Sequence, residues 1–118
     1  MSGHRSDLVG TALSGACMVH CVSMPGVMAA APAAGAVLGG FHPLLLIAVA
    51  GVALWAFVPG WRRHREGSVL VGAAVGLTLL AAAAFAFDEG VLETVFSLAG
   101  AVAMMAAHLK NRALLRAA

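Results

Sequence analysis

The stretch that decides the fold is residues 8–61, LVGTALSGACMVHCVSMPGVMAAAPAAGAVLGGFHPLLLIAVAGVALWAFVPGW. These 54 residues contain no Asp, Glu, Lys or Arg. A helix needs ~20 predominantly apolar residues to cross the hydrocarbon core of a bilayer, so the stretch is long enough for two spans and a connection. We expect the spans at residues 8–30 and 43–61, because prolines and an Ala/Gly-rich segment interrupt the stretch between them.

Two further apolar segments complete the predicted membrane domain. Residues 68–87 and 91–109 are each long enough to span a bilayer, and residues 88–90 are a predicted tight turn between them. Over the whole chain 62% of residues are apolar and 10% are charged, whereas a soluble domain carries about 25% charged residues. The apolar residues occur in long runs, which is not the alternating pattern of a membrane β-barrel. The sequence therefore predicts one all-α domain over residues 1–118, a polytopic membrane protein with a bundle of four transmembrane helices.

The basic residues all fall on one side of this predicted map. They precede the first span, connect the second to the third, and follow the fourth: Arg5, Arg62, Arg63, Arg65, Lys110, Arg112 and Arg116. Basic loops stay in the cytoplasm, so we expect both termini to be cytoplasmic. The small residues around Pro32 also imitate the cleavage site of a secretory signal, but the apolar run is long for a signal and proline is unfavourable there.

A glycine pair in the third span indicates close helix packing. Gly72 and Gly76 have the Gly-x-x-x-Gly spacing that lets two helix backbones approach each other. The partner helix can belong to the same four-helix bundle or to a second copy of the chain. The sequence leaves both the intramolecular contact and the homo-oligomer open.

Few side chains in the spans can carry chemistry. The acidic residues lie at loops and helix ends, so we expect no carboxylate inside the membrane for a proton-coupled pump. The chain shows no set of residues typical of an enzyme active site and no surface suited to nucleic acid. We therefore expect no catalytic residues, and we expect the partners to be the lipid bilayer and a small ion.

The segment CMVHC, residues 17–21, is the strongest candidate for that ion's site. Cys17, His20 and Cys21 share one face of a helix because their spacing is i, i+3, i+4. Thiolates are soft donors that suit soft metal ions, and imidazole is an adaptable third ligand. Pro25 removes the backbone hydrogen bond to the carbonyl of Cys21 and so loosens the helix beside the thiols. Met24 and Met28 continue the same stripe and are expected to be packing residues.

Three other histidines are further candidate ligands. His42 lies at the outer side of the predicted map, whereas His64 and His108 lie at the inner side. An ion could therefore pass from His42 to the thiol pair and leave towards His108 and His64. His4 lies in the polar segment before the first span and is not a candidate.

Three motifs are spread over nearly the whole chain and are fairly specific in combination: Leu13-Ser14-x-x-Cys17-x-x-His20-Cys21-x-x-x-Pro25, His64-Arg65 and Ala107-His108-Leu109-x-Asn111-Arg112. Together they resemble the MerC family of mercury-resistance transport proteins. The resemblance implies a four-span protein of a bacterial inner membrane. It also implies that mercuric ion is taken up at the cysteine pair of the first span and reaches acceptor thiols in the cytoplasm.

The chain departs from the well-known mercury transporters of that family in its cysteines. Those proteins have a Cys-x-x-Cys pair in the first span and a second pair in a C-terminal tail, whereas this chain has Cys-x-x-x-Cys and no cysteine after Cys21. It is more similar to less-characterised members with a Cys-x-x-His-Cys pattern. The expected ion is therefore Hg(II) or another soft or transition metal ion such as Zn(II), Cu(I) or Cd(II).

Two alternatives from other classes stay open. A membrane thiol oxidoreductase would need a disulfide, but Cβ atoms at i, i+4 on a helix lie ~5–6 Å apart, whereas a disulfide needs ~3.5–4.5 Å. A haem-binding or structural membrane subunit would use the histidines instead of the thiols. Metal handling is preferred because it tolerates the wider thiol spacing.

Overall fold

The computed structural model describes residues 2–88 and 90–118, and within them all regular elements are helices. The order along the chain is α1 (Ser2–Ala30), α2 (Pro32–Gly39), α3 (His42–His64), α4 (Gly67–Phe85) and α5 (Val91–Ala117). Four helical segments of the described chain are long and apolar enough to cross a membrane, when α2 and α3 are counted as one. The protein is an all-α membrane protein with four spanning helices, as the sequence predicts.

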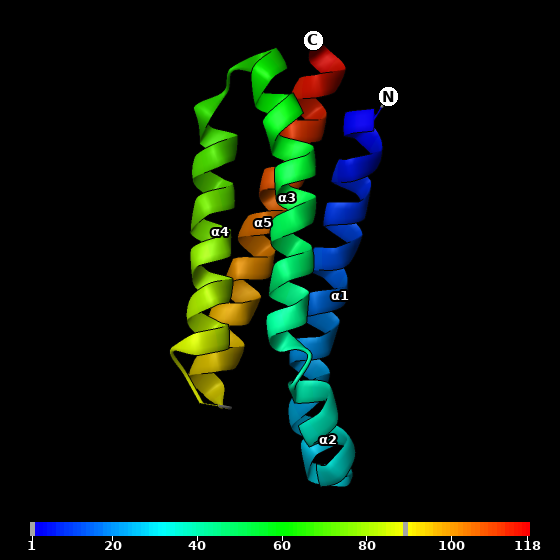
Figure 1. Ribbon diagram of the computed structural model, residues 1–118, viewed down its shortest axis with the longest axis vertical. Coiled ribbons are helices and arrows are strands. Elements are labelled where there is room, and N and C mark those ends of the chain that lie inside the picture. The colour runs from blue at the N-terminus through cyan, green and yellow to red at the C-terminus, as the bar shows by residue number, and fades with distance from the viewer. Residues whose placement is uncertain (1, 89) are drawn as a thin grey trace.

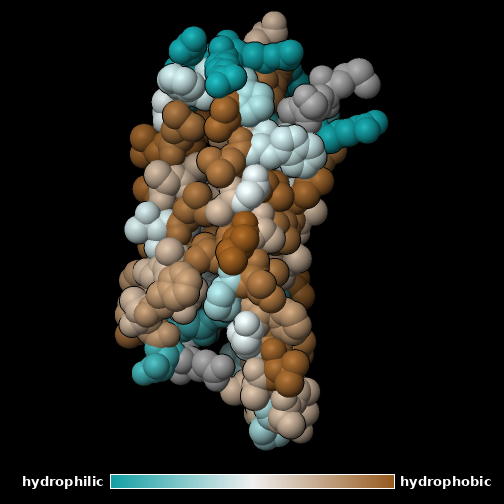
Figure 2. Space-filling model, viewed as in Figure 1, coloured by the Kyte–Doolittle hydropathy of each residue, from teal (hydrophilic) through white to brown (hydrophobic). Residues whose placement is uncertain are grey.

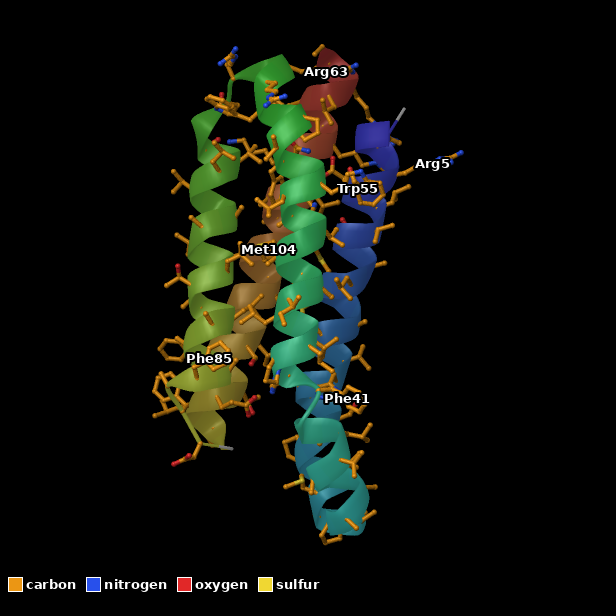
Figure 3. The ribbon with its side chains drawn as sticks, viewed as in Figure 1. Arg5, Phe41, Trp55, Arg63, Phe85 and Met104 are labelled. Atoms are coloured by element: carbon orange, nitrogen blue, oxygen red, sulfur yellow. The ribbon has the colours of Figure 1, made fainter. Side chains whose placement is uncertain are left out.

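The four long helices lie side by side with their two ends clearly different (Figure 1). We call the end with both termini and the α3–α4 turn the basic end, because it carries Arg5 and Arg63 (Figure 3). At the other end, α1 and α2 form a hairpin that projects beyond α4 and α5, and we call this the hairpin end. Figure 2 shows hydrophilic residues gathered at the basic end above a broad hydrophobic belt.

The helices differ from the predicted spans mainly at their ends. The expected loop after residue 30 contains the short helix α2, which begins at a proline. Both α1 and α5 continue beyond the apolar stretches, from Ser2 and to Ala117, because helical hydrogen bonding can extend past the hydrocarbon into polar sequence. Helix α4 ends at Phe85 instead of residue 87. Of the predicted turn, Glu89 lies outside the described residues.

Helix α4 packs on α5 through glycine. A Cβ atom on Gly76 would lie 2.7 Å from Met104 Cγ and 3.1 Å from the carbonyl oxygen of Gly100, so no larger residue fits there. Gly72 of α4 likewise faces Ala107 of α5. Met104 of α5 is fully buried near the middle of the bundle (Figure 3). The Gly-x-x-x-Gly pair is therefore used inside the chain, and it no longer argues for a homo-oligomer.

Helix α1 presents one buried face to α3 and α5. Along this helix the buried residues recur at intervals of three or four, which is the period of a helix face: Ser6 and Asp7, then Gly10, Ser14, Cys17 and Cys21. This face carries little apolar side-chain volume. Its polar and sulfur-bearing residues therefore point into the bundle, where they meet side chains of α3 and α5.

Candidate metal site

The two cysteines lie on the buried face of α1, nearer to the hairpin end than to the basic end. Each side chain is 3% exposed, and both thiols are free. They lie one helical turn apart on the same face of α1. Helix α1 is continuous through both residues, so the unwinding that a disulfide between them would require is not present.

His42 brings an imidazole from α3 to the thiol pair. It is the first residue of α3 and is followed by Pro43, whose fixed φ angle suits the first turn of a helix. His42 Nε2 lies 3.8 Å from Cys21 Sγ and 3.5 Å from Ser97 Oγ of α5. His42 lies 21 residues after Cys21, so the sequence alone does not show that the two side chains meet. The packing of the helices brings them into contact.

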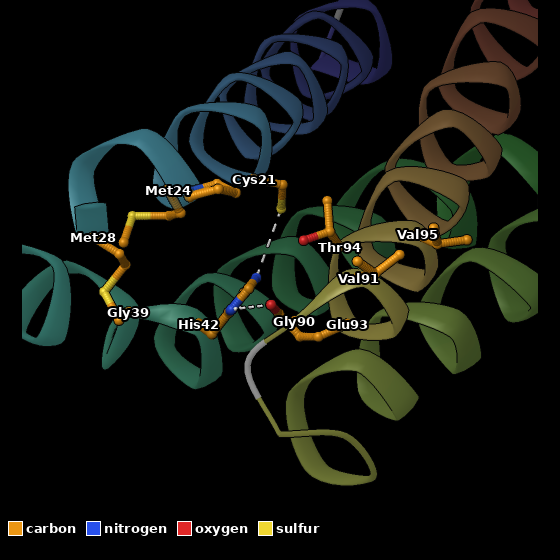
Figure 4. A pocket seen from close by; sticks show the side chains of 11 residues that line it. Cys21, Met24, Met28, Gly39, His42, Gly90, Val91, Glu93, Thr94 and Val95 are labelled. Carbon is orange, nitrogen blue, oxygen red and sulfur yellow. Dashed lines mark hydrogen bonds and ion pairs between the residues drawn. The ribbon is translucent and has the colours of Figure 1, made fainter. Parts of the chain in front are cut away.

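Glu93 of α5 fixes the orientation of the His42 ring. Its Oε1 atom lies 2.9 Å from His42 Nδ1, as the dashed lines in Figure 4 show. An ionised carboxylate only accepts hydrogen bonds, so the Nδ1 proton belongs to the imidazole. In the neutral ring Nε2 then carries the lone pair, and this atom faces Cys21. A carboxylate behind an imidazole is the usual way to orient a histidine ligand.

His20 completes the group around Cys21. Its ring lies edge-on to that of His42, with 5.6 Å between the ring centroids. Within the described residues the buried Nε2 atom of His20 has no hydrogen-bond partner. The same is true of Ser14 Oγ, which lies one turn from Cys17 towards the basic end. Buried polar atoms are normally satisfied, so these two atoms are free to receive a ligand.

A pocket of about 470 Å³ opens over Cys21 at the hairpin end (Figure 4). It lies between the α1–α2 hairpin and the start of α5, and apart from small and apolar residues it is lined by Cys21, Met24, Met28, His42 and Glu93. Cys17 lies one turn deeper and does not line the pocket. The pocket therefore gives a small ion a path from the hairpin end to the first thiol.

A second polar cluster occupies the basic end. Asp7 Oδ1 lies 3.0 Å from His108 Nδ1, and both side chains are at most 1% exposed. Asn111 donates to Asp7 Oδ2 at 2.8 Å, and its own Oδ1 atom lies 2.8 Å from His64 Nε2. We call these four residues the basic-end cluster. Asp7 lies near the start of α1, as the sequence places it, but its carboxylate is fully buried between helices at the basic end.

Two glycines make room for the basic-end cluster. A Cβ atom on Gly10 would overlap the His108 ring, and one on Gly60 would overlap the amide of Asn111. The other face of the His108 ring stacks on Phe57, with 4.4 Å between the centroids. The cluster thus links α1, α3 and α5 through buried and mutually satisfied groups.

The predicted site residues therefore fall into two groups. Cys17, Cys21, His20 and His42 lie together, whereas His64 and His108 belong to the basic-end cluster. The ten residues from Asp7 to Cys17 correspond to ~15 Å along a helix axis. Within the described residues, no three His, Cys, Asp or Glu side chains lie close enough together to hold a metal ion without moving.

Sequence reasoning missed Asp7, Glu93 and Ser97 as parts of these groups. For Asp7 a signal existed, because it lies on the same helical repeat as Cys17 and Cys21 and therefore had to share their buried face. Glu93 and Ser97 gave no such signal, since only the packing of α5 against α3 brings them to His42.

Comparison with protein families identifies the family of the chain. The profile of the MerC mercury resistance protein family matches residues 7–113, which is most of the chain. The chain belongs to the MerC family. The match begins at Asp7 and includes the thiol pair, His42 and the basic-end cluster. MerC membership makes this a mercury-resistance membrane protein. No curated protein and no solved structure matches the chain significantly.

Proposed function

We propose that this MerC protein carries mercuric ion across a bacterial inner membrane, with Cys17 and Cys21 as the binding site. The observation that carries the proposal is the position of Cys21 in the wall of the pocket, beside the Nε2 atom of His42 and one turn from Cys17. Two thiolates suit a soft dication. They also neutralise its charge inside the low-dielectric bundle, where an isolated ion would be costly.

The distribution of charge supports an inward direction of transport. All seven Lys and Arg residues flank the basic end of the bundle, so we assign this end and both termini to the cytoplasm. The pocket then opens towards the outer side of the membrane. Mercuric ion would bind from that side and be released to acceptor thiols in the cytoplasm.

His20 and His42 supplement the thiols in this proposal. Both imidazoles lie beside Cys21, and the free Nε2 atom of His20 supports its assignment as a third donor. Zn(II) and Cd(II) usually need four ligands, so the histidines matter more for them than for a two-sulfur Hg(II) complex. The exit towards His108 and His64 stays a prediction, because between the thiols and Asp7 α1 offers only the hydroxyls of Thr11 and Ser14.

The proposal is tested by replacing the thiols. The Cys17→Ser, Cys21→Ser double variant should lose stoichiometric Hg(II) binding in purified protein and Hg(II) uptake by cells. Binding by the parent should release protons and weaken at low pH, because ligand thiols must be deprotonated. Parent-like binding and uptake by the double variant would show that the site lies elsewhere in the chain.

A further inference from the structure

Two thioethers line the part of the pocket nearest to the hairpin end, which we call its mouth. Met24 and Met28 follow Cys21 on α1 at intervals of three and four residues, so they continue its helix face towards the hairpin end. Both side chains are half-buried, and both line the pocket together with Cys21 and His42 (Figure 4). Four side chains with sulfur or nitrogen donors thus line one space.

The α1–α2 hairpin holds the outer thioether at this space. Gly35 is the buried residue of α2, and a Cβ atom there would overlap Met28 Sδ. Because Gly35 has no side chain, α2 lies directly against Met28 and encloses its sulfur on one side. A methionine that only faced lipid would not need this glycine contact.

We propose that Met24 and Met28 form a second binding site, a thioether site for soft cations at the mouth of the pocket. Thioether sulfur is a soft donor that selects ions such as Cu(I) and Ag(I). It carries no proton, so binding there needs no deprotonation, unlike binding at the thiols. For Hg(II), the site captures the ion before it reaches Cys21, a step that rests on the proposed function.

Binding of Ag(I) to protein without thiols tests the site directly. The Cys17→Ser, Cys21→Ser variant should bind about one equivalent of Ag(I), and the added pair Met24→Leu, Met28→Leu should abolish this binding. Leu has nearly the volume of Met, so packing is preserved. Met105→Leu in the same background is the matched control and should leave Ag(I) binding unchanged, because Met105 lies near Gly15, away from the pocket.

A second measurement keeps the methionines and asks whether Ag(I) protects them from oxidation. In the Cys17→Ser, Cys21→Ser variant, Ag(I) should slow peroxide oxidation of Met24 and Met28 several-fold and leave Met105 unprotected. The absence of Ag(I) binding would overturn the proposal. So would Ag(I) binding that survives the methionine substitutions, because the histidines would then be the ligands.

The capture of Hg(II) by the thioethers is tested separately, by uptake. With both thiols present, Met24→Leu, Met28→Leu should lower Hg(II) uptake several-fold at limiting concentration and leave the equilibrium stoichiometry at the thiols unchanged. Unchanged uptake in this variant, together with complete loss in the double Cys variant, would reject capture by the thioethers while leaving the proposed function intact.

Discussion

At the residue scale, the decisive contact is the one that positions His42. Its imidazole stands between a thiol of α1 and a carboxylate of α5, with Cys21 Sγ at 3.8 Å from Nε2 and Glu93 Oε1 at 2.9 Å from Nδ1. The carboxylate keeps the lone pair of Nε2 directed at the thiol. Glu93 is therefore a positioning residue that acts on the ion through His42.

Replacing Glu93 by Gln should weaken binding of ions that need the imidazole. Loss of a carboxylate behind a ligand histidine typically costs roughly 10–100-fold in metal affinity, and we expect about the lower value for Cd(II), measured by competition with a chelating dye. Two-sulfur binding of Hg(II) should change less. Glu66→Gln, at an exposed site of the basic end, is the control. Equal Cd(II) affinities in the two variants would refute the positioning role.

At the element scale, the buried face of α1 explains why this helix can hold both groups of polar residues. The thiol pair and Asp7 share the face, and Gly10 between them lets the helix approach the His108 ring. A buried carboxylate is costly to leave without partners, and the partners of Asp7 are His108 and Asn111 of α5. The basic-end cluster therefore fixes how α1 packs on α3 and α5.

Gly10→Ala should destabilise the protein, because the new methyl group overlaps His108. Overpacking of this kind costs about 1–3 kcal/mol, which should lower the thermal unfolding midpoint in detergent. Gly26→Ala is the matched control on the same helix, since a Cβ atom there meets nothing within 4 Å. It should leave the midpoint unchanged or raise it, because Ala is the better helix former. Equal midpoints for the two variants would contradict the tight packing at Gly10.

At the scale of the whole molecule, the sequence predicted the membrane fold because that fold depends on local composition. Runs of apolar residues show where helices cross, and helical spacing put Cys17 and Cys21 on one face. The contact of His42 with Cys21 and the pairing of Asp7 with His108 could not be read in this way, although the helical repeat could have placed Asp7 on the buried face of α1. They depend on how α1, α3 and α5 pack together, and a single sequence carries no direct record of that packing.

The central claim is that the two thiols of α1 hold mercuric ion, and X-ray absorption spectroscopy at a mercury edge tests it most directly. The purified protein loaded with one equivalent of Hg(II) should show two thiolate sulfur neighbours, and the Cys17→Ser, Cys21→Ser variant should lose both of these, leaving at most the longer bonds of weakly held thioether sulfur. The Met24→Leu, Met28→Leu variant should retain both thiolate neighbours, because the thioethers capture the ion but do not hold it at equilibrium. A spectrum of the parent with only nitrogen or oxygen neighbours would contradict the account.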